Sequence, residues 1–288
     1  MLELQNVTKS FGKGVTAVAD LSLTLQAGVV GLIGHNGAGK TTLMQMIATL
    51  SRPSSGRILF DGADIKARPD GIRARLGYLP QDFGVYRNVS ALEFMQYFAA
   101  LKGVRDPHRI RRLLELVNLH QQAGRMASTF SGGMLRRLGI AQALLNDPDI
   151  LVVDEPTAGL DPEERLRFRN LLAELGVDKL VIISTHIVSD VETIAGQLAI
   201  LRSGRLVACD TPDAILGRAR GQVWSASVDA DEYDILKETT HVLQALRQGG
   251  RVALRIAHPS APCAGAQPAE PSLEEALMAQ RYALREAA

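Results

Sequence analysis

Residues 29–42 read VVGLIGHNGAGKTT, a short apolar run followed by a glycine-rich turn and two threonines. The run at 29–33 is rich in β-branched residues, which is typical of a strand buried on both faces. The segment that follows, LMQMIATL, predicts a helix. From Gly34 to Thr41 the turn matches the pattern GxxxxGK[ST], whose glycines let successive backbone N–H groups point at a phosphate. We therefore expect an α/β fold built around a phosphate-binding P-loop.

Each part of this loop is expected to meet a different part of a nucleoside triphosphate. Lys40 is expected to reach the β- and γ-phosphates, the Thr41 hydroxyl to bind Mg²⁺, and Thr42 to contact the α-phosphate. The full phosphate-binding set is Gly34, His35, Asn36, Gly37, Ala38, Gly39, Lys40, Thr41 and Thr42. The loop alone fits kinases, GTPases, recombinases and transporters alike.

Two further apolar runs resemble the first, at 150–153 before DEP and at 180–184 before TH. Short runs of this kind, separated by helical patterns, indicate a parallel sheet buried on both faces. After the second run, Asp154 is expected to hold Mg²⁺ through water. Glu155 is expected to face the other way on an extended chain and to polarise an attacking water. Acids at strand ends also occur as helix caps or surface pairs.

Two other polar residues are candidates for the same chemistry. His186 follows the third run in IISTH and is a candidate γ-phosphate sensor, although a lone histidine at a strand end is more often structural. Gln81 lies in GYLPQDFG, and an amide coordinates Mg²⁺ or positions water in some sites and hydrogen-bonds a loop in others. Together with Lys40 and Glu155, they make up the candidate catalytic set.

The segment DPEERLRFRNLLAEL predicts a helix after the second run. Asp161 is expected to cap it, Pro162 to occupy its first position and Glu164 to complete a capping box. A largely helical insert is expected at about 85–145. Its arginines are interpreted as solvated surface charge: Arg109, Arg111, Arg112, Arg136 and Arg137.

The pattern of apolar and polar residues changes from about Gly221. Two weakly β-like runs, VWSASV and RVALRI, precede a loop with several prolines and a last expected helix, LEEALMAQRYAL. We therefore expect a main domain over residues 1–220 and a small C-terminal α+β domain over 221–288, whose task is not legible from its residues.

The composition is that of an ordinary soluble protein. The chain has 288 residues and a net charge of +1, so it has no strong field to recruit nucleic acid or an anionic membrane. The two cysteines, Cys209 and Cys263, lie far apart, which indicates a reducing compartment. No secretory leader is recognisable, and the apolar runs fall short of the ~18 residues that span a bilayer. We expect a cytosolic protein whose membrane role comes from a partner.

The ordered set GHNGAGKTT, YLPQ, FSGGM, ILVVDEP, AGLD and STH resembles the nucleotide-binding subunit of ATP-binding cassette (ABC) transporters over about residues 1–220. The stretch YLPQDFGVYRNVSALEFMQYFAALKG, the arginines after SGGM and the ending PSLEEAL resemble the ABC-2 or drug-resistance exporter type. The resemblance implies a P-loop NTPase with an ABC-type core sheet, an antiparallel β subdomain and a helical signature subdomain.

The resemblance also implies roles for individual residues. Phe11 is implied to stack on adenine, Gln81 to sense Mg²⁺ and relay motion, Asp161 to cross a dimer interface, and His186 to act as the switch histidine. The residues implied to contact the ATP of a second subunit are Ser131, Gly132 and Gly133. The sequence departs from the common pattern at Met134, where glutamine is usual.

The resemblance further implies ATP and Mg²⁺ as ligands and a head-to-tail pair of such subunits, expected to be identical. An integral membrane permease is implied to dock on residues 82 to about 103 and to hold the protein on the cytoplasmic face of the membrane. No nucleic-acid partner is expected. Three alternatives stay open: a soluble ABC ATPase acting on nucleic acid or ribosomes, a regulatory cassette that does not hydrolyse ATP, and an importer-type subunit. His35, where proline is frequent, is expected to leave the loop intact.

Overall fold

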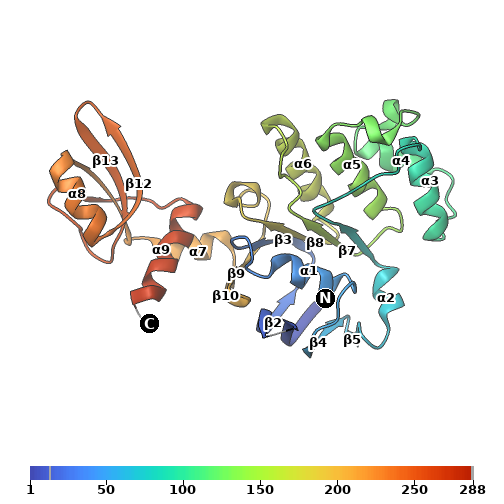
Figure 1. The fold of residues 1–288 in the computed structure, drawn as a ribbon, viewed down its shortest axis with the longest axis horizontal. Helices are drawn as coiled ribbons and strands as arrows, with labels where there is room; N and C mark the ends of the chain where they lie inside the picture. Colours follow the sequence, from blue (N-terminus) through green and yellow to red (C-terminus); the bar gives the residue numbers. More distant parts are fainter. Residues whose placement is uncertain (13, 287–288) are drawn as a thin grey trace. The chain divides into compact units, whose positions relative to one another are not determined.

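The computed structural model describes residues 1–12 and 14–286, and these divide into two compact units, Met1–Cys209 and Asp210–Ala288 (Figure 1). The division lies before helix α7 (Pro212–Ala219), which contacts α9 (Leu273–Glu286). It therefore falls about ten residues before the domain boundary expected from the sequence. Within the described residues, no helix is long and apolar enough to cross a bilayer.

The centre of the first unit is a six-stranded sheet in the order β10-β9-β3-β8-β7-β6. Its strands are β3 (Gly28–Ile33), β6 (Leu76–Leu79), β7 (Ile150–Asp154), β8 (Leu180–Thr185), β9 (Gln197–Arg202) and β10 (Arg205–Asp210). Strands β6 to β9 and β3 pair in parallel, with Val30 and Val152 both in register with Ile182. The three apolar runs are thus the neighbouring strands β3, β8 and β7, as predicted.

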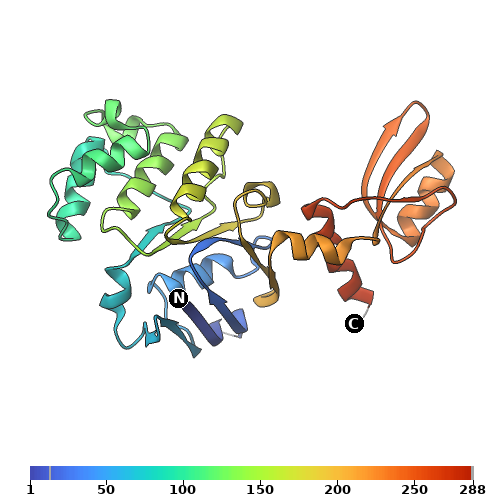
Figure 2. The same ribbon diagram turned by 180° about the vertical axis from the view of Figure 1, so that it is seen from behind.

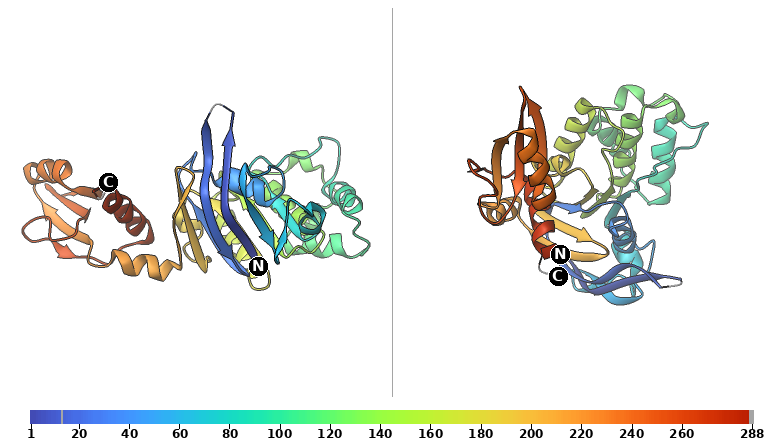
Figure 3. Two further views of the ribbon diagram at one scale, coloured as in Figure 1. Left: turned by 90° about the horizontal axis from the view of Figure 1, so that it is seen from below. Right: turned by 60° about the vertical axis from the view of Figure 1, so that its left-hand side comes forward.

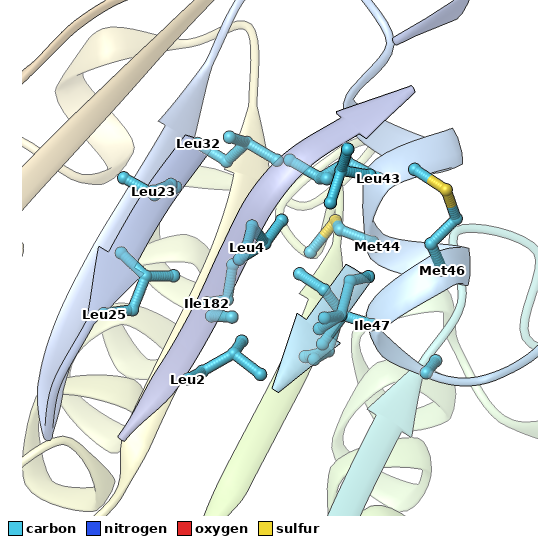
Figure 4. Close-up of a cluster of buried hydrophobic side chains, with 14 of the residues drawn as sticks. Leu2, Leu4, Leu23, Leu25, Leu32, Leu43, Met44, Met46, Ile47 and Ile182 are labelled. Atoms are coloured by element: carbon cyan, nitrogen blue, oxygen red, sulfur yellow. The ribbon is translucent and has the colours of Figure 1, made fainter. Parts of the chain in front are cut away.

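A second, antiparallel sheet has the order β2-β1-β4-β5. It is built from β1 (Leu2–Phe11), β2 (Val15–Leu25), β4 (Ser55–Phe60) and β5 (Ala63–Asp64), and the long β1–β2 ribbon is drawn in blue in Figure 3. This sheet, the parallel sheet and helix α1 (Lys40–Ile47) share one core (Figure 4). Each fully buried leucine or isoleucine there contributes about 1.5–3 kcal/mol. Labelled members of this core are Leu2, Leu4, Leu23, Leu25, Leu32, Leu43, Met44, Met46, Ile47 and Ile182.

A helical segment lies between β6 and β7 in the sequence and forms a separate part of the first unit (cyan to green in Figure 2). It contains α3 (Ala91–Leu101), α4 (Arg109–Leu116), two short 3₁₀ turns and α5 (Gly132–Ala143), and α2 (Pro69–Arg73) precedes β6. Helix α5 packs against β6 so closely that a Cβ on Gly139 would lie 2.5 Å from the Leu79 side chain. The glycine therefore lets the two elements approach.

The P-loop is held by distant parts of the first unit. A Cβ on Gly39 would lie 2.3 Å from the carbonyl oxygen of Ala17 in β2, and a Cβ on Gly204, between β9 and β10, would lie 2.7 Å from the same oxygen. The Gly204 N–H donates to the Ala38 carbonyl at 3.1 Å, and the Ala19 N–H donates to the Gly204 carbonyl at 2.8 Å. Strand β2 and the turn between β9 and β10 therefore meet behind the loop.

The second unit contains a sheet of order β12-β13-β11-β14. Its elements after α7 are β11 (Val223–Val228), α8 (Ala230–Thr239), β12 (His241–Gln248), β13 (Arg251–Ala257), β14 (Gln267–Pro268) and α9. The sequence predicted β11, β13 and α9 but not α8 or β12. Leu236 of α8 joins Val228, Val252, Leu254 and Ile256 in a small core of this unit.

Candidate nucleotide-binding site

The loop between β3 and α1 has the conformation of a phosphate cradle. Gly37 and Gly39 have φ of 81° and 101°, values that favour glycine. Helix α1 begins at Lys40, and its N-cap Gly39 offers no side chain to the first backbone N–H groups. The helix start therefore presents unsatisfied donors and the positive end of its dipole. Both properties suit an anion, and a phosphate in particular.

A pocket of about 460 Å³ opens at this loop. Its lining is Ala17, Asn36, Gly37, Ala38, Gly39, Lys40, Thr41, Thr42, Gln81, Glu155, Ala158 and His186. The fold therefore brings Gln81, Glu155 and His186 to the P-loop from three separate strand ends. Two lining residues, Ala17 and Ala158, were not anticipated, because alanine carries no functional group that marks it in a sequence.

A chain of polar contacts crosses the pocket. Lys40 Nζ donates to the Gly34 carbonyl at 2.6 Å and the His35 carbonyl at 3.4 Å, and it pairs with Glu155 Oε1 at 3.4 Å. The other carboxylate oxygen, Glu155 Oε2, lies 2.9 Å from His186 Nδ1. Lys40 and Glu155 are buried, whereas the His186 side chain is 46 % exposed. The histidine therefore faces solvent while the other two lie at the base.

Glu155 departs from the extended backbone expected for it. Its φ is 45°, in the left-handed region that costs a residue other than glycine roughly 1–2 kcal/mol. Its N–H donates to the carbonyl oxygen of Ser184 at 3.2 Å and to Ser184 Oγ at 3.0 Å. The chain thus turns sharply after Asp154, and this turn directs the Glu155 carboxylate toward Lys40 and His186. Strain of this kind is commonly found at functional sites.

Asp154 is fully buried at the end of β7. Its Oδ1 accepts a short hydrogen bond from Ser184 Oγ, whereas Oδ2 has no hydrogen-bond partner. Burial, and then the nearby charge of Asp154, raise the pKa of Tyr78 to about 12. An orphaned, buried carboxylate oxygen is a feature that a cation or its water shell satisfies. Asp154 therefore fits Mg²⁺, as do the hydroxyl of Thr41 and the amide of Gln81.

The metal would need ligands besides acids. No group of three or more histidine, cysteine or acidic side chains lies close enough to hold an ion in the described part of the chain. Mg²⁺ usually binds through one or two carboxylates together with substrate phosphates.

Gly34 and His35, whose carbonyl groups accept from Lys40, are not in the lining of this pocket as the described residues form it. Three other sets of predicted nucleotide-binding residues are also absent from it. Phe11 ends β1 with its ring 45 % exposed, and Lys9 Nζ lies 5.0 Å from the ring centroid. Ser131 caps α5 and accepts a hydrogen bond from the Met134 N–H at 3.3 Å, next to Gly132 and Gly133. Asp161 caps α6 (Pro162–Leu175). Ser131, Gly132 and Asp161 are thus exposed at helix starts, whereas Gly133 is buried.

The arginines after FSGGM are not the free surface charge expected for them. Arg136 donates to the Pro80 carbonyl at 3.1 Å, immediately before Gln81, and burial lowers the pKa of its guanidinium. Arg137 lies 3.2 Å from Glu164 Oε2. The Glu164 carboxylate pairs with Arg137 and Arg167 and does not return to the backbone at the helix start, so the capping box expected for α6 is wrong. The Asp161 cap and Pro162 in the first turn are confirmed.

A similar correction applies to Arg109. Its guanidinium donates to the Leu144 carbonyl at 2.7 Å and is only 21 % exposed. Arg111 and Arg112 are exposed, as predicted. The sequence pattern does not distinguish an exposed arginine from one that donates to a carbonyl group far away in the chain.

The segment expected to dock a membrane subunit shows exposed aromatic rings. Tyr86 and Tyr97 are exposed and meet edge to face, with ring centroids 6.1 Å apart. Leu101, at the end of α3, is also exposed. Phe83 and Phe94 form a second edge-to-face pair, with Phe94 buried. The segment therefore has a packed inner side and an apolar outer side.

Comparisons with known proteins agree with this geometry. The family described as ABC transporter matches residues 18–158. The Nod factor export ATP-binding protein I of Cupriavidus metallidurans is 36% identical over 83% of this chain and 80% of that protein. The bacitracin transport ATP-binding protein BcrA of Enterococcus faecalis is 34% identical over 72% of this chain and 68% of that protein.

A solved structure of a cassette similar to this chain adds the reaction itself. It is a dimeric ATP-binding cassette, MJ0796, in a post-hydrolysis state bound to ADP and Pi. It is 26% identical with a TM-score of 0.67, and the match covers 73% of this chain and 98% of that one. The chain belongs to the ABC transporter family, as an ATP-binding subunit with ATPase activity.

Proposed function

We propose that this protein hydrolyses ATP at a site closed by a second copy of itself, and that it thereby powers export through a separate membrane subunit. The observation that carries the proposal is the convergence of the P-loop, Glu155 and His186 on one pocket. Phosphoryl transfer requires mainly positioning and charge neutralisation, and these groups supply both.

Each residue has a proposed role in the pocket. Lys40 exchanges its carbonyl and carboxylate partners for the β- and γ-phosphates when ATP enters. Glu155 accepts the proton of the attacking water, and His186, which is bonded to Glu155, contacts the γ-phosphate. Thr41, Gln81 and Asp154 would hold Mg²⁺, which supplies charge neutralisation on the phosphates when bound. The orphaned Oδ2 of Asp154 supports this assignment.

The remaining predicted residues are proposed to act across a dimer. Ser131 at the N-cap of α5 and Gly132 after it are exposed and outside the lining of the pocket, so they are available to the ATP of another subunit, with Gly133 buried behind them. Asp161 at the start of α6 is proposed to lie at the same interface. Phe11, exposed at the end of β1, is proposed to stack on adenine.

Export, rather than import, is proposed from the relatives. Two of them are named for Nod factor export and bacitracin transport. The exposed aromatic side of residues 82–103 is proposed as the dock for the membrane subunit, which would place the protein on the cytoplasmic face of the membrane. The substrate would then be selected by that subunit.

The test is ATP-dependent dimerisation of the full chain, measured by light scattering. Glu155→Gln should form a dimer with ATP, and Glu155→Gln combined with Ser131→Arg should bind ATP but remain monomeric. Thr211→Arg, at the N-cap of α7, is the matched control for losing a cap and gaining a charge. Both substitutions are compared in the Glu155→Gln protein. If the Ser131→Arg protein formed a dimer as stable as that of the Thr211→Arg protein, the proposed contact across the interface would be refuted. Identification of the membrane protein that co-purifies with the chain tests export.

A further inference from the structure

A buried hydrogen bond joins Thr157 and Asp190, two residues that are close in sequence to Glu155 and His186 of the pocket. Thr157 follows Glu155 by two residues, and Asp190 follows His186 by four, in a 3₁₀ turn at Val188–Asp190. Both side chains are 2 % exposed, and Thr157 Oγ1 donates to Asp190 Oδ2. The two loops that carry Glu155 and His186 are therefore joined a second time, in addition to the hydrogen bond between those two side chains.

Helix α6 fastens the same turn from the other side. Arg165 Nε lies 3.7 Å from Asp190 Oδ1, and Arg169 Nη1 donates to the Ser189 carbonyl at 2.7 Å. The two arginines are four residues apart and share one face of the helix. Asp190 Oδ1 has no hydrogen-bond partner among the described residues, so Arg165 stabilises this buried carboxylate by its charge alone, and an unpaired charge is costly away from water. The turn after His186 is thus fixed by Thr157 and by α6.

The His186 ring itself has little packing to hold it. Its side chain is 46 % exposed and its bond to Glu155 Oε2 is 2.9 Å long. The position of the ring therefore depends on the backbone that carries it. A displacement of about 1 Å at reacting groups lowers rates by as much as 10²-fold. A fixed turn after His186 is accordingly of direct value for hydrolysis.

We propose that Thr157 and Asp190 form a positioning pair that holds the His186 loop against the Glu155 loop during ATP hydrolysis. The inference rests on the proposed roles of Glu155 and His186. Neither Thr157 nor Asp190 contacts substrate: the pair acts through the two residues in the pocket. Its loss should lower the rate of hydrolysis and leave the binding of ATP to the P-loop almost unchanged.

The test uses two substitutions that differ by one hydroxyl group. Thr157→Val keeps the shape of the side chain but removes the donor, whereas Thr157→Ser keeps the donor. We expect kcat of the full chain to fall at least about tenfold in the valine variant, with KM for ATP within about twofold of wild type. The serine variant should recover most of the rate. Unfolding temperatures, measured in parallel, establish that each variant is folded at the assay temperature.

Two reference variants separate the possible outcomes. Thr239→Val, on exposed α8 of the second unit, makes the same chemical change elsewhere and should leave kcat unchanged. His186→Ala reports the role of the histidine. If His186→Ala lowers kcat and Thr157→Val does not, the positioning pair is refuted while the proposed function stands. If His186→Ala retains the wild-type rate, the role of His186 is itself wrong. A failure of serine to rescue also contradicts the inference.

Discussion

Lys40 and Glu155 form an ion pair inside the nucleotide pocket, with the lysine Nζ 3.4 Å from the glutamate Oε1 and both side chains less than a tenth exposed. The ammonium group that is proposed to receive the phosphates is thus held by the carboxylate that is proposed to activate water. The arrival of ATP must separate this pair, so the charge of Glu155 opposes binding as well as serving hydrolysis.

Glu155→Gln should therefore bind ATP more tightly and hydrolyse it much more slowly. Loss of the Glu155 carboxylate frees Lys40 and removes the repulsion between that carboxylate and the phosphates. We therefore expect the Kd for ATP, measured by calorimetry, to be a few fold lower. The rate should fall by about 10²-fold or more, because a general base contributes roughly 10²–10⁴-fold. Glu163→Gln, on the exposed start of α6, is the control. Weaker binding by the Glu155 variant would contradict the competition.

Gly39→Ala should destabilise the fold more than Gly37→Ala. Both glycines have positive φ, so each substitution incurs a backbone cost of about 1–2 kcal/mol. Only the Gly39 variant also forces a Cβ to 2.3 Å from the Ala17 carbonyl, whereas Gly37 has open space around it. We expect a further loss of about 1–3 kcal/mol in urea unfolding. Equal losses in the two variants would show that β2 yields to the extra atom.

Arg136→Met should lower ATPase activity by a few fold and stability by about 1–3 kcal/mol. The substitution removes a charged donor from the carbonyl of Pro80, and that carbonyl immediately precedes Gln81. Arg111→Met is the matched control, since Arg111 is exposed and pairs only at the surface with Glu115. Steady-state kinetics and thermal unfolding of both variants provide the comparison. If the two arginine variants had the same activity and the same unfolding temperature, Arg136 would have no more effect than an exposed arginine, and the prediction would be wrong.

Lys102 gives the stability of the first unit a pH dependence. Burial lowers the pKa of Lys102 to about 8, although its Nζ donates to Asn146 at 2.8 Å and to the Gln142 carbonyl at 3.2 Å. Because the unfolded chain, with a pKa near 10.5, binds this proton more tightly, stability rises with pH between about 8 and 10.5. Below about pH 8 the full penalty of the buried charge applies.

The comparison of wild type with Lys102→Met isolates this effect. The stability of wild type relative to the variant should rise by up to about 3 kcal/mol from pH 8 to 10.5, less any screening by solvent. Urea unfolding at several pH values in this window measures the difference. A difference between the two proteins that stays constant with pH would show that Lys102 titrates normally.

The sequence predicted the parallel sheet and the pocket because the signals for both are local. The runs at 29–33, 150–153 and 180–184 are apolar on both faces, which is typical of a strand covered on both sides. The residues proposed to act in the pocket follow these runs directly, in GHNGAGKTT, DEP and TH. The left-handed turn at Glu155 was missed, since the hydrogen-bond partner of its N–H is Ser184 on the neighbouring strand β8, 29 residues away in the chain. The residues that neighbour Glu155 in the sequence do not indicate a hydrogen-bond partner on another strand.

The arginines and the second unit show the same limit. Arg136 and Arg137 find Pro80 and Glu164, which lie 56 and 27 residues away in the chain. Strand β12 is exposed over most of its length and has no regular alternation of apolar residues, so periodicity could not predict it. The Thr157–Asp190 bond likewise joins positions 33 residues apart, and two small polar residues near a motif attract no notice alone.

The meeting of Gly39 and Gly204 at the carbonyl of Ala17 has a consequence for the order of folding. The loop becomes complete only when segments about 190 residues apart have come together, and such long closures form slowly compared with local helices. During synthesis, a chain that has not yet reached Gly204 contains every residue of the P-loop but lacks its support. Affinity for ATP should therefore arise late and abruptly, as a property of the finished first unit.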